Sequence, residues 1–154
     1  MTMTLDRLVS RHARYRGELP AVQFEARRLN WREFNAFCNQ VANAYQKAGL
    51  KKGDKVVTIL PNSLELITLY WAVTSLGAIV VPLSPLLNPV GIAKLLKACA
   101  AYSVVVSPMH EQELKTLLSE QSLATRLLVL GDFQQENSFS GFISGAPTSS
   151  VEAS

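Results

Sequence analysis

The residue types that most often carry chemistry are few in this chain, which holds two histidines and two cysteines. His12 and His110 lie far apart in the sequence, and neither stands at a recognisable nucleophile turn, so no catalytic triad is predicted. Cys38 and Cys99 fall on apolar stripes of predicted helices, where a free cysteine acts as a small hydrophobic residue. These four side chains also match no usual zinc-site spacing. The sequence therefore predicts no catalytic residue and no metal ligand.

Phosphate binding by backbone N–H groups needs clustered glycines, as in GxGxxG or GxxxxGK[ST]. The eight glycines of this chain form neither pattern. Residues 144–150 are rich in Ser, Thr and Gly, but they include no lysine and lead into no predicted helix. We interpret this stretch as a linker, and we predict no cofactor-binding residue.

Two polar residues, Asn62 and Ser63, follow a predicted strand at residues 55–60 that Pro61 ends. Ligands of α/β proteins bind at the carboxyl ends of parallel strands, so these side chains could form a pocket wall. The alternative, which we favour, is that they cap the next helix, with Asn62 as the cap and Glu65 in the third helical position.

The elements that would position these residues alternate between strands and helices. Apolar runs predict four buried strands, at residues 55–60, 78–81, 102–106 and 126–130. This order is typical of an α/β domain with a three-layer, open, mostly parallel sheet and helices on both faces. A helix near residues 5–14, a short hairpin, and a helix that begins at Asn30 with Glu33 and ends at Gly49 are predicted before the sheet.

Length and composition support one domain with a hydrophobic core, since 48% of the 154 residues are hydrophobic. We predict an α/β subdomain over residues 1–132. Residues 133–154, with six serines, two glycines and a proline, are expected to be a flexible linker or a frayed C-terminal end. The apolar run at residues 64–81 is interrupted by Gly77, so we predict a buried helix and strand there rather than a membrane span.

The net charge of +3 is too small to indicate nucleic-acid binding. Residues 1–55 hold eleven Lys and Arg against five Asp and Glu. Arg7, Arg11 and Arg14 share one helix face, and Leu5, Leu8, Val9 and His12 are expected on the opposite, buried side. The arginine face is either a patch for an acidic partner or membrane, or a solvated surface. We favour the solvated surface, because no apolar anchors are expected among the arginines. The free cysteines and the lack of a signal peptide predict a cytoplasmic protein.

Five segments resemble, in order, the N-terminal part of the AMP-forming adenylating enzymes, which include acyl-CoA synthetases, aryl-CoA ligases and luciferases. The segments are PAV (20–22), LNWREF (29–34), GLKKGDKV (49–56), LPNSLEL (60–66) and LGAIVVPLSP (76–85). The fourth has a form typical of acyl- and aryl-CoA ligases. Ser84 stands where the family has Asn, and Trp31 where it has Tyr. The resemblance covers about residues 5–130.

The resemblance implies a parent ligase that converts a carboxylic acid, ATP and CoA to acyl-CoA, AMP and pyrophosphate, with ATP, Mg and CoA as its cofactors. The family's Thr/Ser-Gly-rich ATP loop and catalytic lysine are expected beyond Ser154. We therefore expect an N-terminal fragment of an acyl-CoA synthetase of fatty acid metabolism, inactive alone. Its partners would be the remainder of that enzyme and, through exposed apolar surface, other copies of itself. A stand-alone interaction or regulatory module and a Rossmann-like small-molecule binder are the alternatives.

Overall fold

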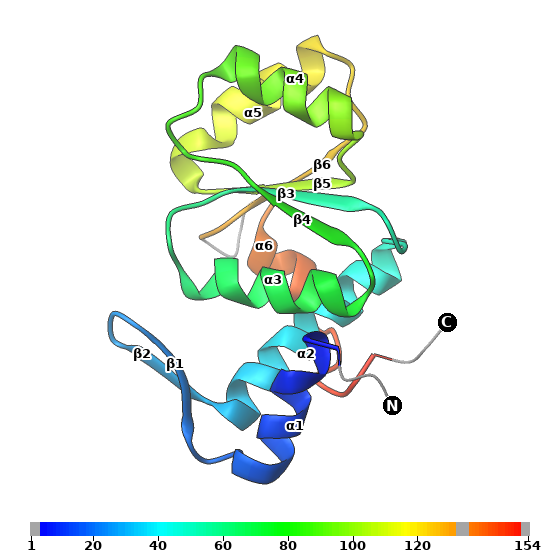
Figure 1. The fold of residues 1–154 in the computed structure, drawn as a ribbon. Helices are drawn as coiled ribbons and strands as arrows, with labels where there is room; N and C mark the ends of the chain where they lie inside the picture. The colour runs from blue at the N-terminus through cyan, green and yellow to red at the C-terminus, as the bar shows by residue number, and fades with distance from the viewer. Residues whose placement is uncertain (1–3, 132–135, 152–154) are drawn as a thin grey trace. The chain divides into compact units, whose positions relative to one another are not determined.

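The computed structural model describes residues 4–131 and 136–151 (Figure 1). The chain divides into two compact units. Residues 1–51, 62–77 and 145–154 form one, which we call the helical unit; residues 52–61 and 78–144 form the other, which we call the sheet unit.

The helical unit contains α1 (Asp6–Arg16), β1 (Pro20–Phe24), β2 (Arg27–Asn30), α2 (Trp31–Ala48) and α3 (Leu64–Ser75). β1 and β2 pair as an antiparallel hairpin. The predicted capping box begins α2: Asn30 Oδ1 accepts from the Glu33 N–H at 2.8 Å, and Glu33 Oε1 accepts from the Asn30 N–H at 2.9 Å. The helix ends at Gly49, whose φ of 107° is in the left-handed region that glycine favours. The structure thus confirms both predicted ends of α2.

One hydrophobic cluster of the helical unit forms where α1, α2, α3 and the hairpin meet. Val9, Phe34 and Cys38 are buried at its centre, and half-buried apolar residues pack against them: Ala21, Val22, Leu29, Trp31 and Trp71. Leu5, expected on the buried side of α1, is instead 74% exposed. It lies just before the first turn of the helix, beyond the reach of this core.

The sheet unit contains β3 (Lys55–Ile59), β4 (Ile79–Pro82), α4 (Pro89–Cys99), β5 (Ser103–Val106), the 3₁₀ turn η1 (Pro108–His110), α5 (Glu111–Glu120), β6 (Arg126–Val129) and α6 (Phe139–Ile143). Its strands pair in the order β4-β3-β5-β6, and all of the pairs are parallel. α4 and α5 lie on one face of the sheet and α6 on the other (Figure 1). The predicted parallel sheet with helices on both faces is confirmed.

The strands differ in burial according to their place in the sheet. β5 is buried along its whole length, and Val56, Val57 and Ile59 of β3 are fully buried. β4 was predicted as a buried strand, but its Ile79 is 47% exposed. β4 is one of the two edge strands and pairs only with β3 among the described strands, so one of its sides lacks a neighbouring strand. β6 lies at the opposite edge, but its last three residues are buried. The apolar run at residues 64–81 is divided between α3 and β4, and among the described residues no helix is long and apolar enough to cross a membrane.

The C-terminal end differs from the unpacked segment that its composition predicts. Phe139 and Ile143 are buried on α6, one helical turn apart, and Ser138 Oγ caps this helix by accepting from the Gly141 N–H at 3.2 Å. Residues 132–135 and 152–154 lie outside the described residues. The boundary after residue 132 therefore stays a prediction.

Residues 147–149, within the helical unit, lie against α2. Asn43 Nδ2 donates to the carbonyl oxygens of Pro147 and Ser149, each at 2.9 Å. Asn39 Nδ2 donates to the Thr148 carbonyl oxygen at 3.0 Å. Two amide side chains one turn apart thus hold a segment that carries no secondary structure of its own.

Candidate functional site

The two predicted site residues, Asn62 and Ser63, lie in a groove of about 510 Å³ within the helical unit. One side of the groove is β1, and the other is the beginning of α3 with the two residues before it. Its apolar lining consists of Val22, Phe24, Leu64, Leu66, Ile67 and Tyr70, and its polar lining of Gln23, Asn62 and Ser63. The structure therefore brings the predicted pair together with a hairpin strand that the sequence did not associate with it.

Ser63, not Asn62, is the N-cap of α3. Ser63 has an extended backbone, and its Oγ accepts from the Leu66 N–H at 3.2 Å. The sequence interpretation of Asn62 as the cap is one residue early, because the helix begins at Leu64. Leu66 then takes the third helical position, and Glu65 is left without a capping-box role.

Glu65 instead pairs with the hairpin. Arg27 Nη1 on β2 lies 2.6 Å from Glu65 Oε1 on α3. The Arg27 side chain is 54% exposed, so solvent screening limits this ion pair to roughly 0–1 kcal/mol of stability. Its contribution to the site is positional, because it ties the hairpin to the helix that forms the opposite side of the groove.

The groove is suited to binding rather than to acid–base chemistry. Among the described residues that line it, none is Lys, Arg, His, Cys, Asp or Glu. The available polar groups are the amides of Gln23 and Asn62 and the hydroxyls of Ser63 and Tyr70. Within residues 4–131 and 136–151, no group of three or more His, Cys, Asp and Glu side chains could hold a metal ion.

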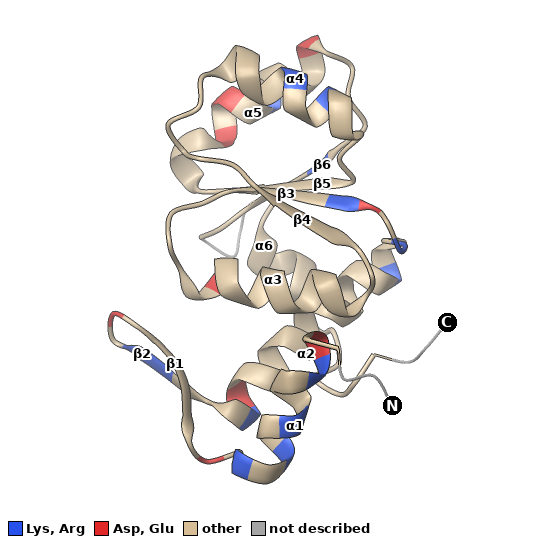
Figure 2. Ribbon diagram, viewed as in Figure 1, with Lys and Arg blue, Asp and Glu red and all other residues tan. Residues whose placement is uncertain are grey.

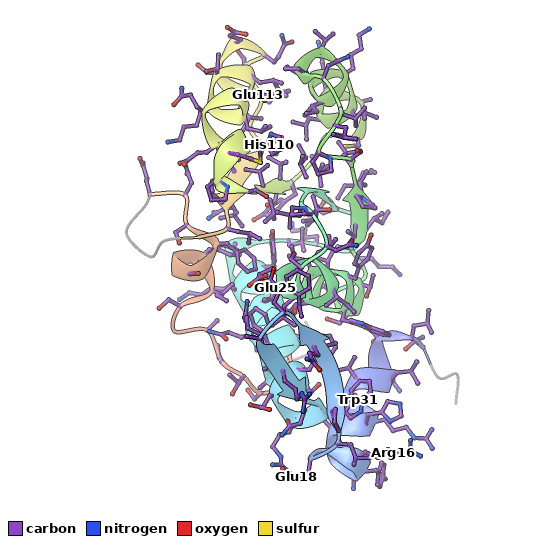
Figure 3. All side chains as sticks on the ribbon, turned by 90° about the vertical axis from the view of Figure 1, so that its left-hand side faces the viewer. Arg16, Glu18, Glu25, Trp31, His110 and Glu113 are labelled. Atoms are coloured by element: carbon purple, nitrogen blue, oxygen red, sulfur yellow. The ribbon has the colours of Figure 1, made fainter. Side chains whose placement is uncertain are left out.

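The two histidines and two cysteines considered in the sequence have surroundings that indicate a structural role. The His12 ring packs 4.6 Å from the Trp31 ring in the helical unit. In the sheet unit, His110 Nδ1 lies 3.8 Å from Glu113 Oε2 (Figure 3). Cys38 is buried, and burial raises the pKa of its thiol to about 12, so the thiol is protonated at neutral pH and is a poor nucleophile. Cys99 is free and half-buried on α4.

Sequence reasoning missed the hairpin side of the groove. Arg27 and Glu65 are 38 positions apart, so no local spacing rule connects them. The only signal was the opposite charge of the two side chains, and many other pairs of residues in the chain would satisfy it equally well. Val22 and Phe24 stand at alternate positions of a predicted strand, which indicates one shared face but not what covers that face.

Comparison with known proteins identifies a protein family that this chain matches. The model of the family described as AMP-binding enzyme matches residues 9–149. A candidate acyl-CoA ligase, YdaB of Bacillus subtilis (strain 168), is 29% identical over 119 residues, which cover 77% of this chain and 24% of that protein. The 3-hydroxybenzoate–CoA/4-hydroxybenzoate–CoA ligase of Thauera aromatica is 26% identical over 116 residues, which cover 75% of this chain and 22% of that protein.

Solved structures give the same result. The anthranilate CoA ligase AuaEII, in complex with anthranoyl-AMP, matches with a TM-score of 0.87 and 25% identity, over 97% of this chain and 29% of that one. The chain spans about a quarter of the length of these two curated relatives, and the match is to the N-terminal part of acyl-CoA ligases.

Proposed function

We propose a function from one premise: this chain belongs to the AMP-binding enzyme family, whose model matches residues 9–149. We infer that it is the N-terminal scaffold of an AMP-forming acyl-CoA synthetase. The parent enzyme would join a carboxylic acid to CoA through an acyl-adenylate, releasing AMP and pyrophosphate. In this proposal the chain supplies the sheet and helices on which later segments build the catalytic site, and it is inactive alone.

The extent of the family match carries this proposal. A fold that superimposes over 97% of this chain on an anthranilate CoA ligase accounts for nearly every described element. The printed sequence contains neither a GxxxxGK[ST] loop nor a Ser/Thr-Gly-rich loop that ends in Pro-Lys-Gly. The lack of both phosphate-binding patterns supports the proposal that adenylation depends on later segments of the parent enzyme.

ATP, Mg and CoA belong to the proposed parent enzyme. The groove beside Asn62 and Ser63 does not fit ATP with Mg, because its described lining offers no basic side chain for phosphates and no carboxylate for the metal. We therefore assign no step of the reaction to this chain. Its proposed partner is the remainder of the ligase, its proposed location is the cytoplasm, and fatty acid metabolism is its proposed context.

The groove itself favours a second candidate, a stand-alone interaction module with the same fold. Ile67 and Tyr70, three positions apart on α3, are each 38% exposed and line the groove. Exposed apolar side chains beside a few convergent polar groups are typical of binding surfaces. In this alternative Asn62 forms a pocket wall, and the chain binds a partner without any enzyme activity.

Segment replacement tests the scaffold proposal. Residues 9–149 would replace the matching segment of the anthranilate CoA ligase, and anthranilate-dependent ATP–pyrophosphate exchange would be measured for the chimera and for the chain alone. We expect exchange from the chimera and none from the chain. A matched chimera with Val57→Asp, which places a charge in the buried β3, is the control that should lose exchange.

Two results would contradict the proposal. Exchange catalysed by the chain alone would show that catalytic groups are present in it. A folded chimera without exchange would show that the segment does not perform the scaffold's part, and it would favour the interaction module.

A further inference from the structure

The edge of β1 that faces away from β2 has no neighbouring strand among the described residues. Residues 22–24 of β1 pair with residues 27–29 of β2, and in the part of the chain that the structure describes no backbone hydrogen bond joins them to any other segment. In an antiparallel pair, alternate residues direct their N–H and C=O groups away from the partner strand. Either Gln23 or both of its neighbours therefore present backbone groups at this edge.

The groove beside Asn62 and Ser63 runs along the same edge. Val22, Gln23 and Phe24 all line it, although consecutive side chains of a strand point to opposite faces. A groove that touches all three residues therefore reaches the edge of the strand and is not confined to one face. No residue of β2, which the structure describes in full, lines the groove, so the edge is the one away from β2.

The opposite wall of the groove is apolar and uncharged. Within α3, all of which is described, Glu65 is the one charged residue, and it pairs with Arg27 and does not line the groove. Figure 2 shows charged residues on the hairpin and at the beginning of α3, and none along the rest of that helix. Ile67 and Tyr70 are each 38% exposed and face the groove. The groove thus combines unpaired strand backbone with a neutral apolar wall.

We propose that an extended segment from the remainder of the parent ligase lies in this groove as a third strand beside β1, an inference that rests on the proposed function. Its backbone pairs with the free N–H and C=O groups of residues 22–24, and its alternate side chains pack on Phe24, Ile67 and Tyr70. The segment is uncharged where it meets this lining, because a charge there would lose water without gaining an ionic partner. At about 3.3 Å per residue, the contact with residues 22–24 is roughly 10 Å long.

The match to known ligases favours a segment of the same enzyme as the occupant. This chain spans 24% of YdaB and 29% of the anthranilate CoA ligase, so most of the proposed parent lies outside it. Residues 147–149 are hydrogen-bonded to α2 within the helical unit. Later segments of the parent therefore leave from the unit that contains the groove.

Other occupants fit the groove less well. A second copy of this chain would bring its own α3 beside its β1, and that helix would compete for the same space. A small apolar ligand would leave the backbone groups of residues 22–24 without partners. A nucleic acid would find no Lys or Arg in the lining to meet its phosphates. A two-stranded hairpin alone is marginally stable in water, so a third strand also stabilises the hairpin itself.

Amide hydrogen exchange tests the proposal. It would be measured for this chain and for the chimera in which residues 9–149 replace the matching segment of the anthranilate CoA ligase. The third strand should slow exchange at residues 22–24 roughly tenfold or more in the chimera, because exchange there then requires the strand to detach. Residues 103–106 of β5, already buried in this chain, are the reference and should change little.

Two results of this measurement would overturn the proposal. One is equal exchange at residues 22–24 in the chain and in a folded chimera. The other is exchange in the chain alone that slows as its own concentration rises, since a second copy would then fill the groove.

Paired substitutions give a second measurement with a matched control. I67S/Y70S removes one aliphatic and one aromatic side chain from the groove, and Y15S/L19S removes one of each from exposed positions outside it, at 69% and 53% exposure. I67S/Y70S should lower the midpoint of thermal unfolding more in the chimera than in the chain, because the third strand packs on these side chains only in the chimera. Y15S/L19S should lower it equally in both. The proposal is overturned if the two double variants behave alike.

The activity of the same chimera separates this inference from the proposed function. Anthranilate-dependent ATP–pyrophosphate exchange without protection of residues 22–24 would overturn the third strand and leave the scaffold proposal intact. Protection without this activity would support the third strand and contradict the scaffold proposal.

A measurement on the chain itself applies where the chimera does not fold. Short overlapping peptides that cover the rest of the anthranilate CoA ligase would be added to the chain. At least one should slow amide exchange at residues 22–24, and it should do so less in I67S/Y70S than in Y15S/L19S. A complete set of peptides without effect would overturn the proposal.

Discussion

At the scale of the residue, Cys38 shows how a nucleophilic side chain can serve the core alone. It is 6% exposed and packs in the cluster formed with Val9 and Phe34. Burial disfavours the thiolate and raises the thiol pKa from 9.0 to about 12, an effect that a backbone hydrogen bond partly offsets. The folded chain therefore binds the Cys38 proton more tightly than the unfolded chain does.

This pKa shift predicts a loss of stability in alkali. Below pH 9 both states hold the Cys38 proton, and between about pH 9 and 12 the unfolded state loses it first, so the free energy of unfolding falls as pH rises. The slope is at most about 1.4 kcal/mol per pH unit. Urea unfolding of wild type and Cys38→Ala from pH 7 to 11 measures it: the difference in stability between the two should shrink above pH 9. A constant difference would contradict the burial effect.

Asn30 is a second residue whose effect can be predicted. Asn30→Ala removes the side-chain acceptor that begins α2, and it should lower the free energy of unfolding by about 1 kcal/mol. Asn30→Asp keeps an oxygen in the same place and should cost much less. Equal losses for both variants in urea unfolding would show that the capping hydrogen bond does not determine the effect.

At the scale of the element, the beginning of α3 distinguishes two neighbouring polar residues. Ser63→Ala removes the oxygen that accepts from the Leu66 N–H, so we expect a loss of about 1 kcal/mol. Asn62→Ala leaves this hydrogen bond intact and should change stability little. Thermal unfolding of the two variants checks the assignment, and the reverse order would support the sequence interpretation with Asn62 as the cap.

The segment held by α2 gives a prediction about local order. Asn43→Ala removes the donor of two hydrogen bonds to residues 147 and 149, so amide hydrogen exchange should become severalfold faster there, with little change in the sheet unit. Asn35→Ala, which removes an amide side chain from the same helix, is the control and should leave exchange at residues 145–151 unchanged. Equal acceleration in both variants would point to a general loosening of α2.

These elements show which parts of the fold can be predicted from sequence. The caps at Asn30 and Gly49 and the four strands depend on local chemistry, and each was predicted within a residue or two. The helix α6 was missed, because Ser, Gly and Pro dominate its neighbourhood and its helical signal is the single pair Phe139 and Ile143. Burial of β4 was overestimated: β4 and β6 are both edge strands, only β6 is mostly buried, and the apolar residues of the two runs do not reveal this difference.

At the scale of the whole molecule, the candidate site was predictable only on one side. Asn62 and Ser63 follow a strand, and the sequence placed them at a pocket wall or a helix cap on that ground. The opposite wall depends on the hairpin packing against α3, a long-range arrangement in which Arg27 pairs with Glu65. No periodicity within either segment contains that information.

Exposed apolar surface leads to the last prediction, which concerns association between copies of the chain. Leu86 is 94% exposed and Val90 66% exposed, with the 38% exposed Leu87 between them, so this short segment of the sheet unit leaves three large apolar side chains in contact with water. Burying them against a second copy would remove that surface from water. We therefore expect the weight-average sedimentation coefficient to rise with protein concentration. This rise should persist at high salt, which does not screen apolar contacts.

The variant L86S/V90S should sediment as a monomer over the same concentration range, since it removes the two most exposed side chains of this segment. L5S/L19S removes two exposed leucines from the helical unit and is the matched control. If the control suppressed association as strongly, the contact would depend on total exposed apolar area rather than on this segment. A wild-type chain that stayed monomeric at every concentration would contradict this prediction, because the three apolar side chains would then remain exposed to water.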